Sequence, residues 1–240
     1  MEKLLYVFWR PAGAVADFTA HFRGVLAPRL TALGAERLQL NIADYPDLDG
    51  ALVNFSLHST RPPPDGIVSF WLSSAWRRAP AEQLLAAACA RLAGYAVAES
   101  TILPNRAHPP EAGERTYGLS QVTLLQVPPR MSFEDWRHVW FEQHTPVGIE
   151  TQANFFYRHN VVVLPLTAQA PPYRGIVEEC FPPAALRDSQ AFYDAVGDEA
   201  RHQRHLARMM ASCARFIDFD RIDVLATSEY RLHDGHEPGL

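Results

Sequence analysis

His144 occupies the most unusual chemical position in this chain of 240 residues. It lies in the stretch SFEDWRHVWFEQHTPVGIE, residues 132–150. Turning each residue by about 100° places Trp136, Trp140 and His144 on one apolar stripe of a helix. Pro146 follows, and a proline inside a helix removes an N–H donor and clashes with an earlier carbonyl, so the helix should bend or restart here. The sequence therefore predicts a buried imidazole beside aromatic rings and a broken helix.

Two neighbouring glutamates, Glu178 and Glu179, lie in a predicted strand over Gly175–Phe181. Strand alternation sends their side chains to opposite faces of a sheet. A carboxylate near an imidazole can fix its tautomer and raise its pKa, which would make His144 a general acid or base. The structural alternatives are a histidine bonded to a carbonyl that Pro146 frees, and a glutamate with its head in water.

Composition excludes several classes of protein. The net charge is −5 and lysines and arginines form no run, which argues against nucleic acid or an anionic membrane as a partner. No apolar run reaches about 18 residues, so no transmembrane helix is expected, and the run Leu4–Trp9 is too short for the core of a signal peptide. The three cysteines match no zinc motif and are interpreted as buried thiols in a reducing cytoplasm, with no metal site.

Two successive sets of elements are predicted by hydrophobic periodicity and turn residues. The first set has strands at Lys3–Trp9, Arg37–Tyr45, Ile67–Leu72 and Val97–Leu103, with a short strand at Ala51–Leu57. Its helices are Val15–Leu33 and Pro80–Leu92, and Gly94 is expected to end the helix Pro80–Leu92. The second set has strands at Gly118–Val127, Phe155–Leu166, Gly175–Phe181 and Arg221–Leu232, a helix at Ser132–Glu150 and a helical region at Pro182–Phe216 broken at Gly197.

The two sets can be superimposed along the sequence. Pro28 matches Pro146 at an offset of 118 (146 − 28), and the same offset places Leu26 opposite His144. At an offset of 109 (175 − 66) the strands GIVSFW and GIVEEC match, which places Ser69 and Phe70 opposite Glu178 and Glu179. A repeat of this length indicates a duplicated domain. The first half therefore lacks the histidine and both carboxylates.

The order β-α-β-β-α-β is that of the ferredoxin-like unit, which has a four-stranded antiparallel sheet with helices on one face. The bare sheet face must be buried. We therefore predict an α+β fold in which two ferredoxin-like halves, residues 1–105 and 118–235 with a linker at 106–117, pack sheet to sheet as an intrachain α/β barrel. This pseudo-dimer needs no second chain, and the sequence leaves a further homodimer open.

The second half resembles the EthD family of the dimeric α/β-barrel superfamily. The resemblance rests on FEDWRHVWFEQHTPV, YRHNVVV, YRGIVEECF and RIDVLATSEY. It includes the pattern Trp140, His144 and Pro146, with Asn160 and Glu178 downstream. The resemblance implies Glu178 as the functional carboxylate, and the first half resembles the family in outline only. The superfamily includes cofactor-free oxygenases, cyclases, lactone isomerases and some haem enzymes.

Three functions remain open at this point. The first is a cofactor-independent enzyme of the lyase, isomerase or monooxygenase type, active in the catabolism of a small hydrophobic, aromatic or polyketide-like molecule. His144 would be its acid or base and Glu178 would orient the imidazole, with the substrate bound by Trp136, Trp140, Tyr157 and Asn160. The second is a haem protein with His144 as axial ligand and Arg137 and Arg158 for the propionates. The third is a non-catalytic carrier of a small molecule.

Overall fold

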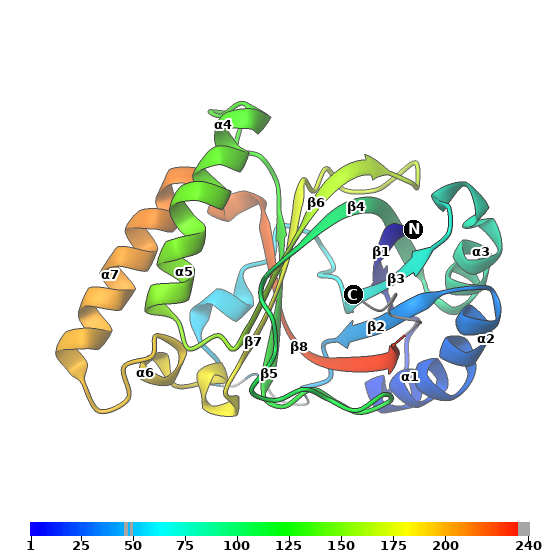
Figure 1. Cartoon of the computed structure of the whole chain (residues 1–240), viewed down its shortest axis with the longest axis horizontal. Helices are drawn as coiled ribbons and strands as arrows, with labels where there is room; N and C mark the ends of the chain where they lie inside the picture. The colour runs from blue at the N-terminus through cyan, green and yellow to red at the C-terminus, as the bar shows by residue number, and fades with distance from the viewer. Residues whose placement is uncertain (46–47, 49, 235–240) are drawn as a thin grey trace.

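Eight strands close into a barrel in the computed structural model, which describes residues 1–45, 48 and 50–234 (Figure 1). The strands follow the order β1-β3-β2-β8-β5-β7-β6-β4, and β4 returns to β1. The first half supplies β1 (Glu2–Trp9), β2 (Glu36–Ile42), β3 (Gly66–Leu72) and β4 (Arg91–Leu103). The second half supplies β5 (Leu119–Leu125), β6 (Phe156–Pro165), β7 (Gly175–Phe181) and β8 (Ile222–His233).

Each half forms the antiparallel sheet of a ferredoxin-like unit. The first sheet has the order β4-β1-β3-β2, and the second has the equivalent order β8-β5-β7-β6. Antiparallel pairing of β2 with β8 and of β4 with β6 joins the two sheets at both edges. The predicted α/β barrel of two facing ferredoxin-like halves is therefore confirmed, and its closure removes the free strand edges that would otherwise favour aggregation.

Helices cover the outside of the barrel, those of each half on their own sheet (Figure 1). The first half has α1 (Val15–His21), a π-helical segment (Phe22–Leu26), α2 (Ala27–Ala32) and α3 (Ala79–Ala88). The second half has α4 (Phe133–His138), a π-helical segment (Val139–His144), α5 (Thr145–Thr151), α6 (Ser189–Phe192) and α7 (Glu199–Phe216). Within the described ranges, no helix has both the length and the apolar character needed to cross a membrane.

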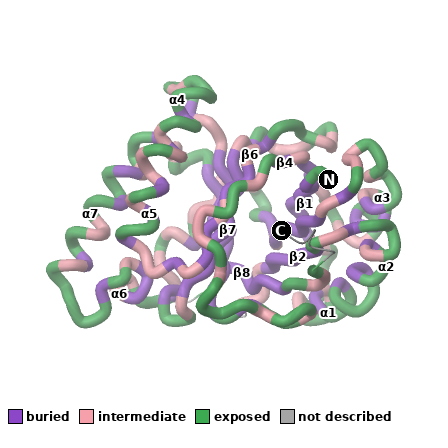
Figure 2. Tube along the Cα trace, in the orientation of Figure 1, coloured by how far each residue is buried: buried purple, intermediate pink, exposed green. Residues whose placement is uncertain are grey.

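Buried side chains form three apolar layers, and Figure 2 shows the purple segments that line the barrel and the helix faces. Leu4 and Phe70 belong to the layer between the first sheet and its helices. Leu5 and Ile176 belong to the layer inside the barrel. Trp140 belongs to the layer between the second sheet and its helices. Alternation along each strand thus sends successive residues into the barrel or under the helices.

The predicted break near His144 takes the form of a π-helical segment that ends at this residue. Pro146 supplies no N–H, and the Thr145 hydroxyl bonds the carbonyl of Trp140 at 2.9 Å. The corresponding segment of the first half is also π-helical, and it ends at Leu26. Leu26 and His144 therefore occupy the same place in the two halves, as the offset of 118 predicts.

Two predicted elements are wrong. Ala51–Leu57 contains a short 3₁₀ helix, Val53–Ser56, and no strand. Gly94 does not end a helix, because α3 ends at Ala88 and β4 already begins at Arg91. A Cβ atom at Gly94 would lie 2.5 Å from the ring of Tyr6. The glycine therefore permits close packing inside a strand, which sequence alone cannot distinguish from a helix stop.

Replacing Leu26 by alanine is expected to lower the free energy of unfolding by about 2–4 kcal/mol, as for other large-to-small changes in a core. Leu26 is 2% exposed and belongs to the first helix layer. Leu26→His should cost at least as much, since a buried imidazole would find only the apolar surroundings of the first half. Urea unfolding measures the free energy of unfolding of both variants, and Val25→Ala, at an exposed neighbouring position, is the control. A neutral Leu26→His would contradict the assignment of this position to the core.

Candidate functional site

The sheet of the second half separates the two carboxylates that the sequence analysis considered. Glu178 points into the barrel, where it accepts a hydrogen bond from Asn160 Nδ2 at 2.8 Å. Glu179 points to the helix layer, where it lines the same cavity as His144. The predicted pairing of His144 with Glu178 is therefore wrong, because the two residues lie on opposite faces of the sheet. The carboxylate on the histidine's face is Glu179.

A cavity of about 130 Å³ lies between the second sheet and its helices, and we call it the helix-side cavity. Its walls are mostly apolar, and they come from β5, β7 and β8 on one side and from the segments around α5 and α7 on the other. Asn54 and Leu57 also line it, although they belong to the first half. The loop between β2 and β3 thus helps to enclose a cavity of the second half.

His144 contacts two residues of α7, Ser212 and Phe216. Its Nδ1 lies 3.0 Å from the Ser212 hydroxyl, and its ring packs against Phe216 with 4.6 Å between ring centroids. Burial lowers the pKa of His144 to about 4, so the imidazole is neutral near pH 7. In the described part of the chain, Nε2 has no hydrogen-bond partner. One ring nitrogen is therefore fixed and the other is available to a ligand.

Glu179 is a carboxyl group in an apolar setting, and it is 6% exposed. Asn154 Nδ2 donates to Oε1 at 2.9 Å and Gln121 Nε2 donates to Oε2 at 3.3 Å. Burial outweighs the hydrogen bond from Asn154 and raises the pKa of Glu179 to about 7. The group therefore changes protonation near neutral pH, which is the property required of a general acid or base.

The predicted aromatic residues divide between the cavity wall and the layer behind it. Trp140 and Tyr157 line the helix-side cavity. Trp136 is fully buried and packs against Trp140, with 4.9 Å between ring centroids. His159 was not predicted, and it is also fully buried, against Trp140 and Tyr157. Strand alternation from Tyr157 could have placed His159 on the helix side, but nothing in its sequence context marked it as unusual.

Glu178 and Asn160 belong to a polar network inside the barrel. Lys3 Nζ donates to Asn160 Oδ1 at 2.8 Å and to Glu99 Oε2 at 2.7 Å, and it lies 3.4 Å from Glu178 Oε1. Arg158 Nη1 lies 3.5 Å from Glu178 Oε2. Despite complete burial, Lys3 and Arg158 hold the pKa of Glu178 down at about 2. The predicted substrate ligand Asn160 is thus far from the helix-side cavity, on the other face of the sheet.

The residues around His144 do not fit a haem group. A haem group is far larger than the helix-side cavity of about 130 Å³. Arg158 lies inside the barrel, and Arg137 is exposed, with its guanidinium 5.9 Å from the Phe141 ring centroid. Neither predicted arginine is therefore placed to bind a propionate beside His144. In the described ranges, no cluster of three or more His, Cys, Asp or Glu residues could hold a metal ion.

These features define a single-chain α/β barrel with one differentiated half. The family model of the EthD domain matches residues 128–220, within the second half whose motifs predicted a resemblance to this family. The match covers the helix with His144 and the strand with Glu179, and it ends just before β8. No curated protein matches the chain in sequence.

Two solved structures share the fold at low sequence identity. An anthrone oxidase-like protein aligns over 100% of this chain and 96% of its own, with 7% identity and a TM-score of 0.52. A monooxygenase candidate from Fusobacterium nucleatum subsp. nucleatum aligns over 100% of this chain and 95% of its own, with 7% identity and a TM-score of 0.52. A chlorite dismutase variant from Candidatus Nitrospira defluvii has 9% identity and a TM-score of 0.48, over 96% and 91% of the two chains.

Proposed function

We propose that the chain is a cofactor-independent enzyme that moves a proton on a small apolar ketone of the aromatic or polyketide-like class, bound in the helix-side cavity. One paired difference carries this proposal. The first half fills the corresponding layer with Leu26 and Phe70, which are 2% and 0% exposed. The second half has His144 and Glu179 there, both facing a cavity. Since apolar residues satisfy the same packing, the polar pair is better explained by chemistry.

Glu179 is the proposed base. A catalytic base works best when its pKa lies near the operating pH, and the pKa of Glu179 is about 7. Its ionised form would take a proton from a carbon next to the substrate carbonyl. The apolar walls keep water from the carboxylate and strengthen its interaction with the substrate.

His144 is the proposed donor to the substrate oxygen. In the proposed tautomer, the Ser212 hydroxyl donates to Nδ1, which leaves the proton on Nε2. The Nε2–H group then donates to the carbonyl oxygen and stabilises the negative charge that develops on it when Glu179 removes the proton. A neutral imidazole suits this role, and burial keeps the pKa of His144 at about 4. Returning the proton to the same or another carbon completes an exchange or an isomerisation.

The substrate class is inferred from the walls and from the relatives. Trp140, Tyr157 and Phe216 offer aromatic surfaces to a molecule of one or two rings. The fold shared with an anthrone oxidase-like protein agrees with a small aromatic ketone as substrate.

Deuterium exchange tests the proposal without an oxidant. The probe is β-tetralone, a bicyclic ketone with an acidic C–H group, incubated in D2O under nitrogen and followed by proton NMR. We expect the protein to accelerate exchange, with a rate that rises through a pH of about 7 as Glu179 ionises. Saturable binding of β-tetralone without accelerated exchange would favour the alternative function, a non-catalytic carrier of a small molecule. A rate that falls as the pH rises through this range would exclude ionised Glu179 as the base.

A further inference from the structure

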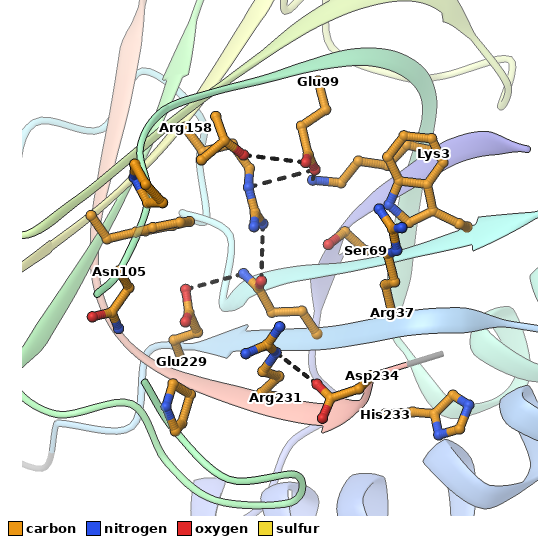
Figure 3. Close-up of a pocket in the computed structure, with 16 residues that line it drawn as sticks. Lys3, Arg37, Ser69, Glu99, Asn105, Arg158, Glu229, Arg231, His233 and Asp234 are labelled. Carbon is orange, nitrogen blue, oxygen red and sulfur yellow. Dashed lines mark hydrogen bonds and ion pairs between the residues drawn. The ribbon is translucent and has the colours of Figure 1, made fainter. Parts of the chain in front are cut away.

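We propose a second binding site, for a small organic carboxylate, inside the barrel. Its place is a cavity of about 320 Å³ at one mouth of the barrel, separated from the helix-side cavity by the second sheet. The volume lies within the roughly 300–1,000 Å³ of ordinary ligand sites. Figure 3 shows the lining side chains, which reach inward from strands of both halves, and we call this space the barrel cavity.

The floor of the barrel cavity is electrically balanced. Lys3 and Arg158 each lie within ion-pair distance of both Glu99 and Glu178, at 2.7–3.5 Å. Two cations and two carboxylates therefore neutralise each other there. Glu229 lies beside this group, and burial together with the charge of Glu178 raises its pKa. Apart from Glu229, a ligand that enters the cavity therefore meets a floor whose charges cancel, and the charges at the rim contribute to which sign is preferred.

Arg37 is a rim arginine without a carboxylate partner in the described part of the chain. It lines the cavity and is exposed, and no described residue forms an ion pair with it. Its guanidinium lies 5.6 Å from the Trp71 ring centroid. The other rim arginine differs, because Arg231 is paired with Asp234 at 2.7 Å. Among the described residues, one positive charge without an ion-pair partner thus faces the opening, which suits a ligand with a single negative charge.

The backbone at Arg37 supports a functional role for its side chain. Arg37 has a φ of 49°, in the left-handed region that non-glycine residues seldom adopt. It lies at a bulge, where the register of β2 shifts against both β3 and β8. Bulges redirect a side chain, and strained residues are retained where they serve a site. Here the bulge brings to the barrel cavity a guanidinium that forms no ion pair with any described residue.

Arg158 offers a second point of attachment deeper in the cavity. Its Nε is buried and lies 3.5 Å from Glu99 Oε2, and it forms no hydrogen bond with a described residue. Its guanidinium lies 4.8 Å from the Phe156 ring centroid. A carboxylate is planar and accepts parallel hydrogen bonds from a guanidinium. The side chains of Trp71, Phe156 and Pro104 line the cavity and provide apolar surface for the body of the ligand. An aromatic or short aliphatic monocarboxylate combines both features.

Calorimetric titration with sodium benzoate tests this site. The unmodified protein should bind benzoate, and Arg37→Gly should weaken the binding about tenfold or more, because a hydrogen bond to a charged group is lost. Glycine tolerates the left-handed backbone, so this variant should remain folded. Benzamidinium, which has the same shape and the opposite charge, should not bind.

Two control variants locate the effect. Arg29→Ala removes an exposed arginine from α2 outside the cavity and should leave benzoate binding unchanged. His144→Leu alters only the helix-side cavity and should also leave benzoate binding unchanged. The carboxylate site can therefore be refuted independently of the proposed enzyme activity. The proposal is overturned if the unmodified protein does not bind benzoate, if Arg37→Gly binds it equally well, or if benzamidinium binds as tightly.

Discussion

Replacing Glu178 by glutamine is expected to lower the free energy of unfolding by about 3–5 kcal/mol, the range seen when one partner of a buried ion pair is removed. Glu178 is fully buried, and its charge balances Lys3 and Arg158. Glutamine has nearly the same shape, so the loss would come from charge and not from packing. In the variant, Glu99 alone would face both cations. Urea unfolding near neutral pH measures the difference.

The same replacement at Glu179 should instead raise the free energy of unfolding at alkaline pH. The pKa of Glu179 rises from 4.5 to about 7 on folding, so its contribution to stability is complete below about 4.5 and is lost as the pH rises through 7. The pKa of Glu178 falls from 4.5 to about 2, so its contribution is complete above about 4.5 and is lost as the pH falls through 2. Glu179→Gln should therefore be more stable than the unmodified protein at a pH of about 8, by on the order of 2–3 kcal/mol.

These two adjacent variants control for each other, because both convert a glutamate of β7 into glutamine. Unfolding curves at pH values of about 5 and 8 should show that Glu178→Gln is destabilised at both, whereas Glu179→Gln gains relative stability between them. Parallel changes in the two variants would show that the two faces of this sheet do not differ electrostatically as the structure indicates.

The fold was predictable because its signals are local and are repeated. Alternation in β7 and the match of Pro28 with Pro146 give two similar halves, and one apolar face on each sheet requires the facing arrangement. The errors occurred where a local signal has two meanings. Gly94 is consistent with a helix stop and with close packing against Tyr6, and only the tertiary contact decides between them.

The candidate site was predictable only in part, because it depends on which face each strand residue occupies. The sequence identified His144 and the glutamate pair, and it established that Glu178 and Glu179 must diverge. It could not decide which of them shares the histidine's layer, because both faces of the second sheet are buried. The face that Glu178 occupies depends on Lys3, which is distant in sequence and pairs with Glu178 inside the barrel.

His144→Leu is expected to leave the protein folded and to reduce the β-tetralone exchange rate by about 10²–10³-fold, the effect of removing one donor to a developing oxyanion. Leucine already fits this place in the first half, where Leu26 ends the equivalent π-helical segment. Loss of a buried polar group should leave the melting temperature equal or higher.

The matched control is His138→Leu, which makes the same chemical change at an exposed position on α4 and should retain the full exchange rate. Ser212→Ala should retain part of the activity, because the imidazole stays in place while the tautomer is no longer fixed by the hydroxyl at 3.0 Å. A His144→Leu protein that melts normally and exchanges β-tetralone at the unmodified rate would remove His144 from the mechanism. One that fails to fold would show that the imidazole holds α5 against α7, in which case the equivalence with Leu26 does not extend to packing.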